Sequence, residues 1–368
     1  MAGFPFMKQA EAFRSSLPFI LLLAVFILPC PMSAAAKPRP AIAFVHLLLP
    51  PGGEPHASPA GWIGSLDRAR DTLESLRIPT IVSSASPRNA EDLNELSEMD
   101  PEVLITTSPL LYAAACDVAK RSPNTVFFAC TDETVHDNMS GFQARTYEAH
   151  YLAGLIAGAL SEDGVIGYLA NDPYQSKASR LRNANAFTLG AQKSKAAIRV
   201  LYAPGNDPDE ELKTLFAAGA DIVDLERALP SLVERLREHS VRYVGTAGRT
   251  VDPLCLAAPE WEWSNAFGDL LTQVRFGIWR PRNVSYGIKE GVVGLSPFGP
   301  AVPETVRVRV REAKEAIRNG ASPFEGPVRD VSGSLRIAEG SVPDDATLRG
   351  MDWRVQGLEP LPLTPDGL

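Results

Sequence analysis

The feature that most constrains this chain is an alternation of apolar strand patterns with amphipathic helix patterns, which occurs twice. In the first run, residues 41–49 form a continuous apolar segment of the kind found in buried parallel strands. The residues that follow at the spacing of one helix face are Trp62, Leu66, Ala69, Leu73 and Leu76. Further strands are predicted at 80–82, 103–107 and 125–129, and further helices around 93–96 and at 110–120.

The second run begins after residue 160 and repeats the same order of elements. Its predicted strands are 165–169, 198–202, 222–225 and 241–244, and its predicted helices are 176–192, 208–219 and 230–239. Asp207 and Glu210 form a capping box around Pro208, and Gly219 is a helix stop. Strands separated by helices of this length predict βαβ units, so the 368 residues are expected to form two doubly wound α/β lobes.

Residues 141–154 lie between the two runs and are expected to cross from one lobe to the other. The aromatic and charged residues of this stretch are predicted to lie near the cleft; they are Phe142, Arg145 and Tyr147. A helix is predicted from Glu148 to about Leu160, and its small residues Gly154 and Gly158 would let a neighbouring helix approach closely.

Beyond residue 245 the pattern becomes less regular. A helix is predicted over 261–277, on which Trp261 and Trp263 would point in nearly opposite directions, one into the core and one toward a cleft. A strand at 292–295 and a helix ending near 319 follow. The last stretch, 323–368, has few helical signals and is expected to wrap over the second lobe.

The first 36 residues are typical of a secretory signal peptide. Lys8 and Arg14 precede an apolar run at 17–28, and Ala34-Ala35-Ala36 is a small-residue cleavage site. The mature protein is therefore expected to begin at Lys37 and to lie in the periplasm or on the outer face of the cytoplasmic membrane. Lipidation at Cys30 is a less favoured alternative because Leu28 and Pro29 precede it, and a retained anchor is a third.

Three cysteines remain in the mature chain, Cys116, Cys130 and Cys255. In an oxidising compartment a bridge between Cys116 and Cys130 is one alternative. Three small buried hydrophobic residues are the favoured interpretation, since an odd number cannot be fully paired within one chain.

Charge and motifs exclude several classes of function. The formal net charge of −8 and the pI of about 5.3 argue against a nucleic-acid groove. The chain has neither a phosphate-binding glycine motif nor a GxSxG elbow. His46, Glu54 and His56 flank the first loop, but without further ligands a metal site is not favoured. The sequence therefore predicts no catalytic residues, no metal and no cofactor.

Several stretches resemble the basic membrane protein family of ABC-transporter substrate-binding proteins. They are residues 138–154, 185–191, 261–263, 289–293, 297–303, 323–327 and 351–353. The resemblance implies a type I periplasmic-binding-protein fold, with two lobes joined by three crossovers and a ligand in the cleft. Lobe 1 would comprise 37–140 with about 258–291, and lobe 2 would comprise 141–257 with about 292–368.

Members of this family that are similar to this chain bind purine nucleosides or free bases and pass them to a membrane permease. Transport of such a small ligand, without catalysis, is therefore expected. The expected ligand-binding residues are Trp62, Ser108, Phe142, Arg145, Asn185, Trp261, Trp263 and Lys289. Trp62 is also favoured by its place just after the first strand, where open α/β sheets bind ligands.

The chain departs from the family pattern at places that concern the ligand. Residues 245–249 lack the acid that the family has there; Ala247 stands in the stretch, and Arg249 could favour an acidic ligand. Two alternatives to purine uptake follow, a binding or sensory protein of the same fold for another small ligand, and, less favoured, an exported enzyme.

Overall fold

The computed structural model describes residues 40–47, 61–85, 91–131, 133, 136–172, 175–245 and 252–362. These residues form one compact unit. The predicted signal peptide, Cys30, and the residues Ala247 and Arg249 lie outside the described part of the chain. No helix within the described ranges combines the length and the apolar character needed to cross a bilayer.

The first sheet has six parallel strands in the order β12-β5-β4-β3-β1-β2. Its strands are β1 (Ile42–Leu47), β2 (Thr80–Ala85), β3 (Val103–Thr106), β4 (Val126–Cys130), β5 (Met139–Ala144) and β12 (Asn283–Tyr286). Its helices are α1 (Trp62–Ser75), α2 (Glu91–Glu98), α3 (Tyr112–Ala119) and α8 (Ser264–Arg275), with a 3-10 turn η1 (Pro109–Leu111) before α3.

Successive residues of β1 point to opposite faces of this sheet, as strand geometry requires. Ile42 and Phe44 belong to the core that includes α1 and α8, whereas Ala43, Val45 and Leu47 belong to a separate core with α2 and α3. Both faces are therefore covered by helices, and a strand buried on both sides needs the continuous apolar run found in the sequence.

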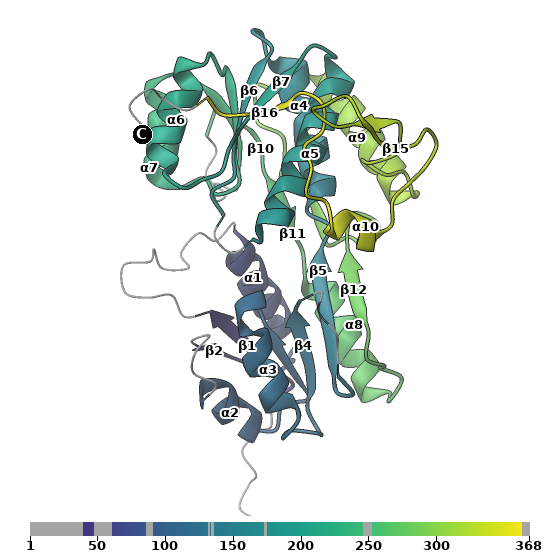
Figure 1. Cartoon of the computed structure of the whole chain (residues 1–368). Helices are drawn as coiled ribbons and strands as arrows, with labels where there is room; N and C mark the ends of the chain where they lie inside the picture. The colour runs from purple at the N-terminus through teal and green to yellow at the C-terminus, as the bar shows by residue number, and fades with distance from the viewer. Residues whose placement is uncertain are drawn as a thin grey trace, which may run out of the picture. The chain divides into compact units, whose positions relative to one another are not determined.

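The second sheet also has six parallel strands, in the order β10-β9-β8-β6-β7-β16. They are β6 (Val165–Leu169), β7 (Arg199–Ala203), β8 (Ile222–Leu225), β9 (Arg242–Gly245), β10 (Cys255–Ala257) and β16 (Leu358–Pro360). One face packs against α4 (Tyr147–Leu160) and α5 (Lys177–Ser194), and the other against α6 (Pro208–Ala217) and α7 (Pro230–Glu238). Figure 1 shows both sheets with their covering helices.

The chain passes between the two sheets three times, as the type I periplasmic-binding-protein fold predicts. It leaves the first sheet from β5 into α4, returns from β10 through β11 (Pro259–Trp261) into α8, and leaves again from β12 into β13 (Val293–Leu295). β11 and β13 pair with each other in an antiparallel ladder, so two of the crossovers run side by side. The predicted fold class is confirmed.

The C-terminal part covers the second lobe, as expected. After α9 (Glu304–Arg318) come β14 (Val328–Arg329), β15 (Leu335–Ile337) and α10 (Asp345–Arg349), and then β16 pairs with β7 (Figure 1). The lobe limits predicted from the sequence remain a proposal; β5, which begins at Met139, pairs within the first sheet.

Three details differ from the sequence expectations. Met139–Ala144 is a strand of the first sheet, because its backbone pairs with both β4 and β12. Trp261 ends β11 and Trp263 is the N-cap of α8, so the predicted helix over 261–277 begins later, at Ser264. Leu76 is the C-cap of α1 and is 66% exposed, because the helix ends before this residue can turn inward.

The two central helices of the second lobe, α4 and α5, pack through glycines. A Cβ atom at Gly154 would lie 2.0 Å from the carbonyl oxygen of Phe187, and one at Gly158 would lie 2.2 Å from that of Ala191. A Cβ atom at Gly190 of α5 would likewise lie 2.1 Å from the carbonyl oxygen of Tyr151 in α4. The prediction that small residues permit close helix approach is therefore confirmed.

This contact yields a stability prediction. Alanine in place of Gly154 would push against backbone atoms that cannot rotate away, so Gly154→Ala should lower the free energy of unfolding by about 1–3 kcal/mol. The control is Gly268→Ala in α8, where a Cβ would meet nothing within 4 Å and helix propensity should raise stability by up to about 1 kcal/mol. Urea unfolding of both variants measures the difference. Equal stability of Gly154→Ala and the wild type would contradict the close contact.

Candidate functional site

A cavity of about 170 Å³ lies where the carboxyl ends of strands from both sheets meet. Thr107 follows β3, Cys130 ends β4, and Gln143 lies near the end of β5; Asp172 follows β6 in the second sheet. Ligands of open α/β sheets bind at this edge. The remaining lining residues are Trp62, Pro109, Ala144, Thr146, Gln175, Ser176, Ala178, Ser179, Arg182, Trp261 and Arg349.

Two of the predicted binding residues, Trp62 and Trp261, line this cavity. The Nε1–H group of Trp62 donates to the carbonyl oxygen of Thr107 at 2.8 Å, which fixes the indole. The two tryptophan rings lie 5.9 Å apart with an angle of 83° between their planes. One end of the cavity therefore has an aromatic wall whose orientation is set by a hydrogen bond.

Phe142 and Trp263 lie behind this wall and are fully buried. Phe142 stacks on Phe128 at 4.6 Å and lies nearly parallel to Trp62 at 6.3 Å, and Trp263 meets Trp62 edge-on at 5.2 Å. Both residues support the position of Trp62 from the core side. Neither belongs to the cavity lining, and the ligand role predicted for them remains a prediction.

Arg145 joins the first crossover to the third. Its Nε donates to Glu148 at 2.6 Å, its Nη2 to Glu290 at 2.5 Å, and its Nη1 to the carbonyl oxygen of Ser285 at 2.7 Å. Glu148 also accepts from the backbone N–H of Ile288 at 2.6 Å. Burial raises the pKa of the Glu148 carboxyl, and the charge of Arg145 opposes that rise. The structure thus places Arg145 in a clamp between crossovers, outside the cavity lining.

The other three predicted residues lie elsewhere. The Ser108 side chain accepts from the backbone N–H of Leu110 at 3.3 Å and caps η1. Asn185 is fully buried and binds the C-terminal segment, donating to the carbonyl oxygen of Trp353 at 2.8 Å and accepting from the N–H of Val355 at 2.9 Å. Lys289 is exposed and does not line the cavity. Their ligand roles are untested predictions.

Sequence and structure comparisons agree with this fold. A family model described as PnrA-like ABC transporter substrate-binding protein matches residues 65–213. Over these residues the chain is similar to the PnrA-like ABC transporter substrate-binding proteins. The resemblance inferred from the sequence motifs is thereby confirmed.

Two curated relatives of this chain differ in the ligand that they are named for. A purine-binding protein of Brucella abortus is 27% identical over 346 residues, covering 89% of this chain and 95% of its own length. A putative ABC transporter glucose-binding protein of Haloferax volcanii is 28% identical over 310 residues, covering 77% of this chain and 78% of its own length.

Solved structures match the fold. A solute-binding protein of an ABC transporter system from Conexibacter woesei has a TM-score of 0.60 at 17% identity, covering 76% of this chain and 97% of that one. A similar protein from Aeropyrum pernix has a TM-score of 0.59 at 16% identity, covering 84% and 95%. The family of the matching model is one of extracytoplasmic substrate-binding proteins of ABC transporters.

The protein also has a cluster of buried acidic residues next to the cavity, which the sequence analysis did not predict. Glu226 is 5% exposed and accepts from the Tyr168 hydroxyl at 2.9 Å and from the backbone N–H of Asp172 at 3.4 Å. Behind it, Asp224 lies 3.4 Å from Nδ1 of His150. Burial raises the pKa of the Glu226 carboxyl well above its usual 4.5, and the charges of Asp172 and Asp224 raise it further.

A simple sequence signal could have predicted two of the residues at the cavity that the sequence analysis did not name. Thr107 is the last residue of the predicted strand 103–107, and Asp172 lies three residues after the predicted strand 165–169, at the edge where such sheets bind ligands. Arg349 has no comparable signal, because it reaches the cavity from the C-terminal segment, far along the chain.

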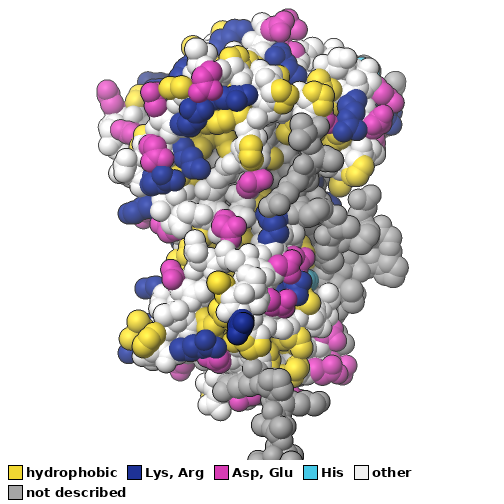
Figure 2. Space-filling model, turned by 180° about the vertical axis from the view of Figure 1, so that it is seen from behind, with side chains coloured by type: hydrophobic (Ala, Val, Ile, Leu, Met, Phe, Trp, Pro, Cys, Tyr) yellow, Lys and Arg dark blue, Asp and Glu magenta, His cyan; other side chains and the backbone are white. Residues whose placement is uncertain are grey.

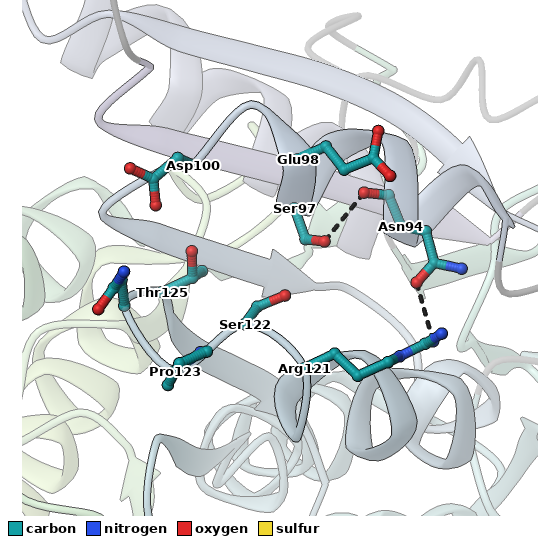
Figure 3. Close-up of a pocket in the computed structure, with 9 residues that line it drawn as sticks. Asn94, Ser97, Glu98, Asp100, Arg121, Ser122, Pro123 and Thr125 are labelled. Atoms are coloured by element: carbon teal, nitrogen blue, oxygen red, sulfur yellow. Dashed lines mark hydrogen bonds between the residues drawn. The ribbon is translucent and has the colours of Figure 1, made fainter.

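A larger hollow of about 410 Å³ lies at the other edge of the first sheet (Figure 3). Its walls come from the end of α2 and from residues 121–125 before β4, and apart from Pro123 they are polar. In Figure 3, Arg121 points across the hollow and donates to Asn94 at 2.9 Å. Because this edge holds the amino ends of β3 and β4, we assign the ligand to the smaller cavity.

The raised pKa of Glu226 predicts a pH effect on stability. The folded state keeps a proton on Glu226 that the unfolded chain releases above pH 4.5, so this contribution is complete below pH 4.5 and is lost as pH rises through the folded-state pKa. Glu226→Gln, which cannot ionise, should therefore gain thermal stability relative to the wild type as pH rises from 4.5 to 8. A difference in melting temperature that stays constant over this range would contradict the raised pKa.

Proposed function

We propose that this protein captures a purine base or nucleoside in the cavity between its lobes and delivers it to the permease of an ABC transporter. The observation that supports this most directly is the aromatic wall of Trp62 and Trp261 at a cavity that also carries hydrogen-bonding side chains. A flat, apolar ring with polar edges suits such a site, because stacking contributes about 0.5–1.5 kcal/mol beyond area burial for each aromatic pair. The purine-binding relative of Brucella abortus supports the same ligand class.

The size of the cavity favours a free base over a nucleoside. Its volume of about 170 Å³ is below the roughly 300–1,000 Å³ of cavities that hold drug-sized ligands. A free base needs less of this volume than the corresponding nucleoside, which adds a ribose. We therefore expect bases to bind more tightly than the corresponding nucleosides.

A different small ligand is the second candidate. Arg182 and Arg349 bring two guanidinium groups to the lining, which would suit a ligand with acidic or carbonyl oxygens. The relative from Haloferax volcanii that is named as glucose-binding supports a sugar as another possibility. A sensory protein of the same fold would use the same cavity and differ in its membrane partner.

Uptake by this route also requires two events at other parts of the protein, export and closure. We propose that ligand binding draws the lobes together about the three crossovers, as the clamp of Arg145, Glu148 and Glu290 lies between two of them. No nucleic-acid partner is proposed. On the face shown in Figure 2, Lys and Arg side chains are interspersed with Asp and Glu.

Export is tested by the mass of the mature protein. Cleavage after Ala36 should give a chain that begins at Lys37. Intact-mass measurement of protein recovered from the exported fraction checks this. A species that begins at Cys30 and carries acyl chains would instead establish a lipoprotein.

Ligand identity is tested by calorimetry with adenine, guanine, adenosine, inosine and glucose. At least one base should bind with a Kd below 1 mM, and Trp62→Ala should weaken it about 10-fold or more because the stacking surface is lost. The control is Trp353→Ala, which removes a tryptophan that packs against Arg336 in the C-terminal segment.

Two results would contradict this proposal in different ways. If no base or nucleoside binds below 1 mM, about −4 kcal/mol, the purine assignment is wrong. If a base binds but Trp62→Ala and Trp353→Ala leave the affinity equally unchanged, the ligand class stands and the stacking site is elsewhere.

A further inference from the structure

The cavity has a rigid acceptor on the side of the second lobe, at the loop after β6. Asp172 is 7% exposed and lines the cavity. The Gln175 side-chain amide donates to its Oδ2 at 3.0 Å, and the Gln175 oxygen in turn accepts from Asn183 at 2.8 Å. Gln175 thus holds one carboxyl oxygen of Asp172 in place, and carboxyl oxygens can accept further hydrogen bonds from a ligand.

The loop that carries Asp172 is held in place by hydrogen bonds to the loop after β8. Asn171 exchanges two hydrogen bonds of 2.8 Å with the backbone of Arg227, so the loops after β6 and β8 are joined. Glu226 accepts from the Asp172 backbone N–H at 3.4 Å and from the Tyr168 hydroxyl at 2.9 Å. Tyr168 is fully buried in the core of the second lobe. Because these bonds exist before a ligand arrives, the position of Asp172 does not have to be organised on binding.

The surrounding charges give this acceptor a defined role. Among the described residues that line the cavity, Asp172 is the one carboxylate, and Arg182 and Arg349 supply the cations. Arg182 donates to the Leu348 carbonyl at 3.2 Å and to the Ser179 hydroxyl at 3.0 Å, which holds it beside α10. A ligand donor suits the side of the cavity that carries the carboxylate, and oxygen or ring-nitrogen acceptors suit the side that carries the guanidinium groups.

We propose that Asp172 selects the ligand by accepting a hydrogen bond from a ring N–H or amino group on one edge of a purine. This inference rests on the proposed function. It assigns to Asp172 the acceptor role of the acidic residue that is missing from residues 245–249, where Ala247 stands. The class of ligand is narrowed to purines that keep an N–H donor on the edge that faces the second lobe. Glu226 and Gln175 act as positioning residues, since they hold the loop and the carboxylate of Asp172.

The first test compares Asp172→Asn with the wild type, using the base that binds the wild type most tightly in calorimetry. Loss of a charged acceptor should weaken binding about 10-fold or more. The matched control is Asp352→Asn, which removes the same charge from an exposed site outside the cavity lining and should leave the Kd within twofold. Circular dichroism confirms that both variants are folded.

The second test changes the ligand and needs no variant. N-methyl derivatives of that base, methylated at one nitrogen at a time, should include one position at which the wild type loses at least about 10-fold in affinity. The same methylation should cost Asp172→Asn much less, because the acceptor for that donor is already gone. This pattern separates loss of the specific hydrogen bond from a general loss of affinity.

The outcomes distinguish the two proposals. If the wild type binds a base and Asp172→Asn binds it within twofold, or if every methyl derivative in the series binds the wild type as well as the parent base does, the role of Asp172 is overturned while the proposed function stands. If the wild type binds no purine, both are overturned. If Asp172→Asn does not fold, the methylation series on the wild type alone decides the question.

Discussion

The close contact between α4 and α5 is the constraint on which the rest of the structure depends. At Gly154 and Gly158 of α4, carbonyl groups of α5 lie so close that a Cβ atom would overlap them. The same is true of Gly190 in α5 and a carbonyl group of α4. This packing places the first turns of α5 at the cavity, where Gln175, Ser176, Ser179 and Arg182 line it. Without glycine at these positions the helices would separate, and the polar wall of the second lobe would move with α5.

The start of α4 carries the second half of this arrangement. Arg145 and Glu148 bind the backbone of residues 285–288, so the helix that supports α5 is also joined to the third crossover. Burial makes these charges costly unless they are paired, and each of them is paired with several groups. α4 therefore connects the third crossover with α5, whose first residues line the cavity. This connection is what the proposed coupling of ligand binding to movement of the crossovers requires.

The two lobes contribute different chemistry to the cavity. The first lobe supplies Trp62, whose indole is held by Thr107 and backed by the buried rings of Phe142 and Trp263. The second supplies Asp172, which is held by Gln175 in a loop tied to the backbone of Arg227. In the proposed complex, the ring of the purine would lie against the aromatic surface and a donor on its edge would face this acceptor.

Local patterns in the sequence were enough to predict the two α/β lobes, the covering helices and their caps. Asp207 does cap α6, accepting from the N–H of Glu210 at 3.2 Å, and Gly219 does adopt a positive φ of 83°. These features depend on neighbouring residues alone. Trp62 could also be placed at the cavity, because the end of a buried parallel strand marks the ligand edge of such a sheet.

Only the tertiary structure decided which side chains face the cavity. Phe142 lies in the core because its ring packs against Phe128 and Phe267, and Asn185 holds the C-terminal segment, although both were expected to bind the ligand. The three residues of β11 are too few to show a period, so Trp261 looked helical in the sequence. Arg349 and Asp172 meet at one cavity from distant parts of the chain, and such meetings arise from strand order and helix packing, which no local pattern records.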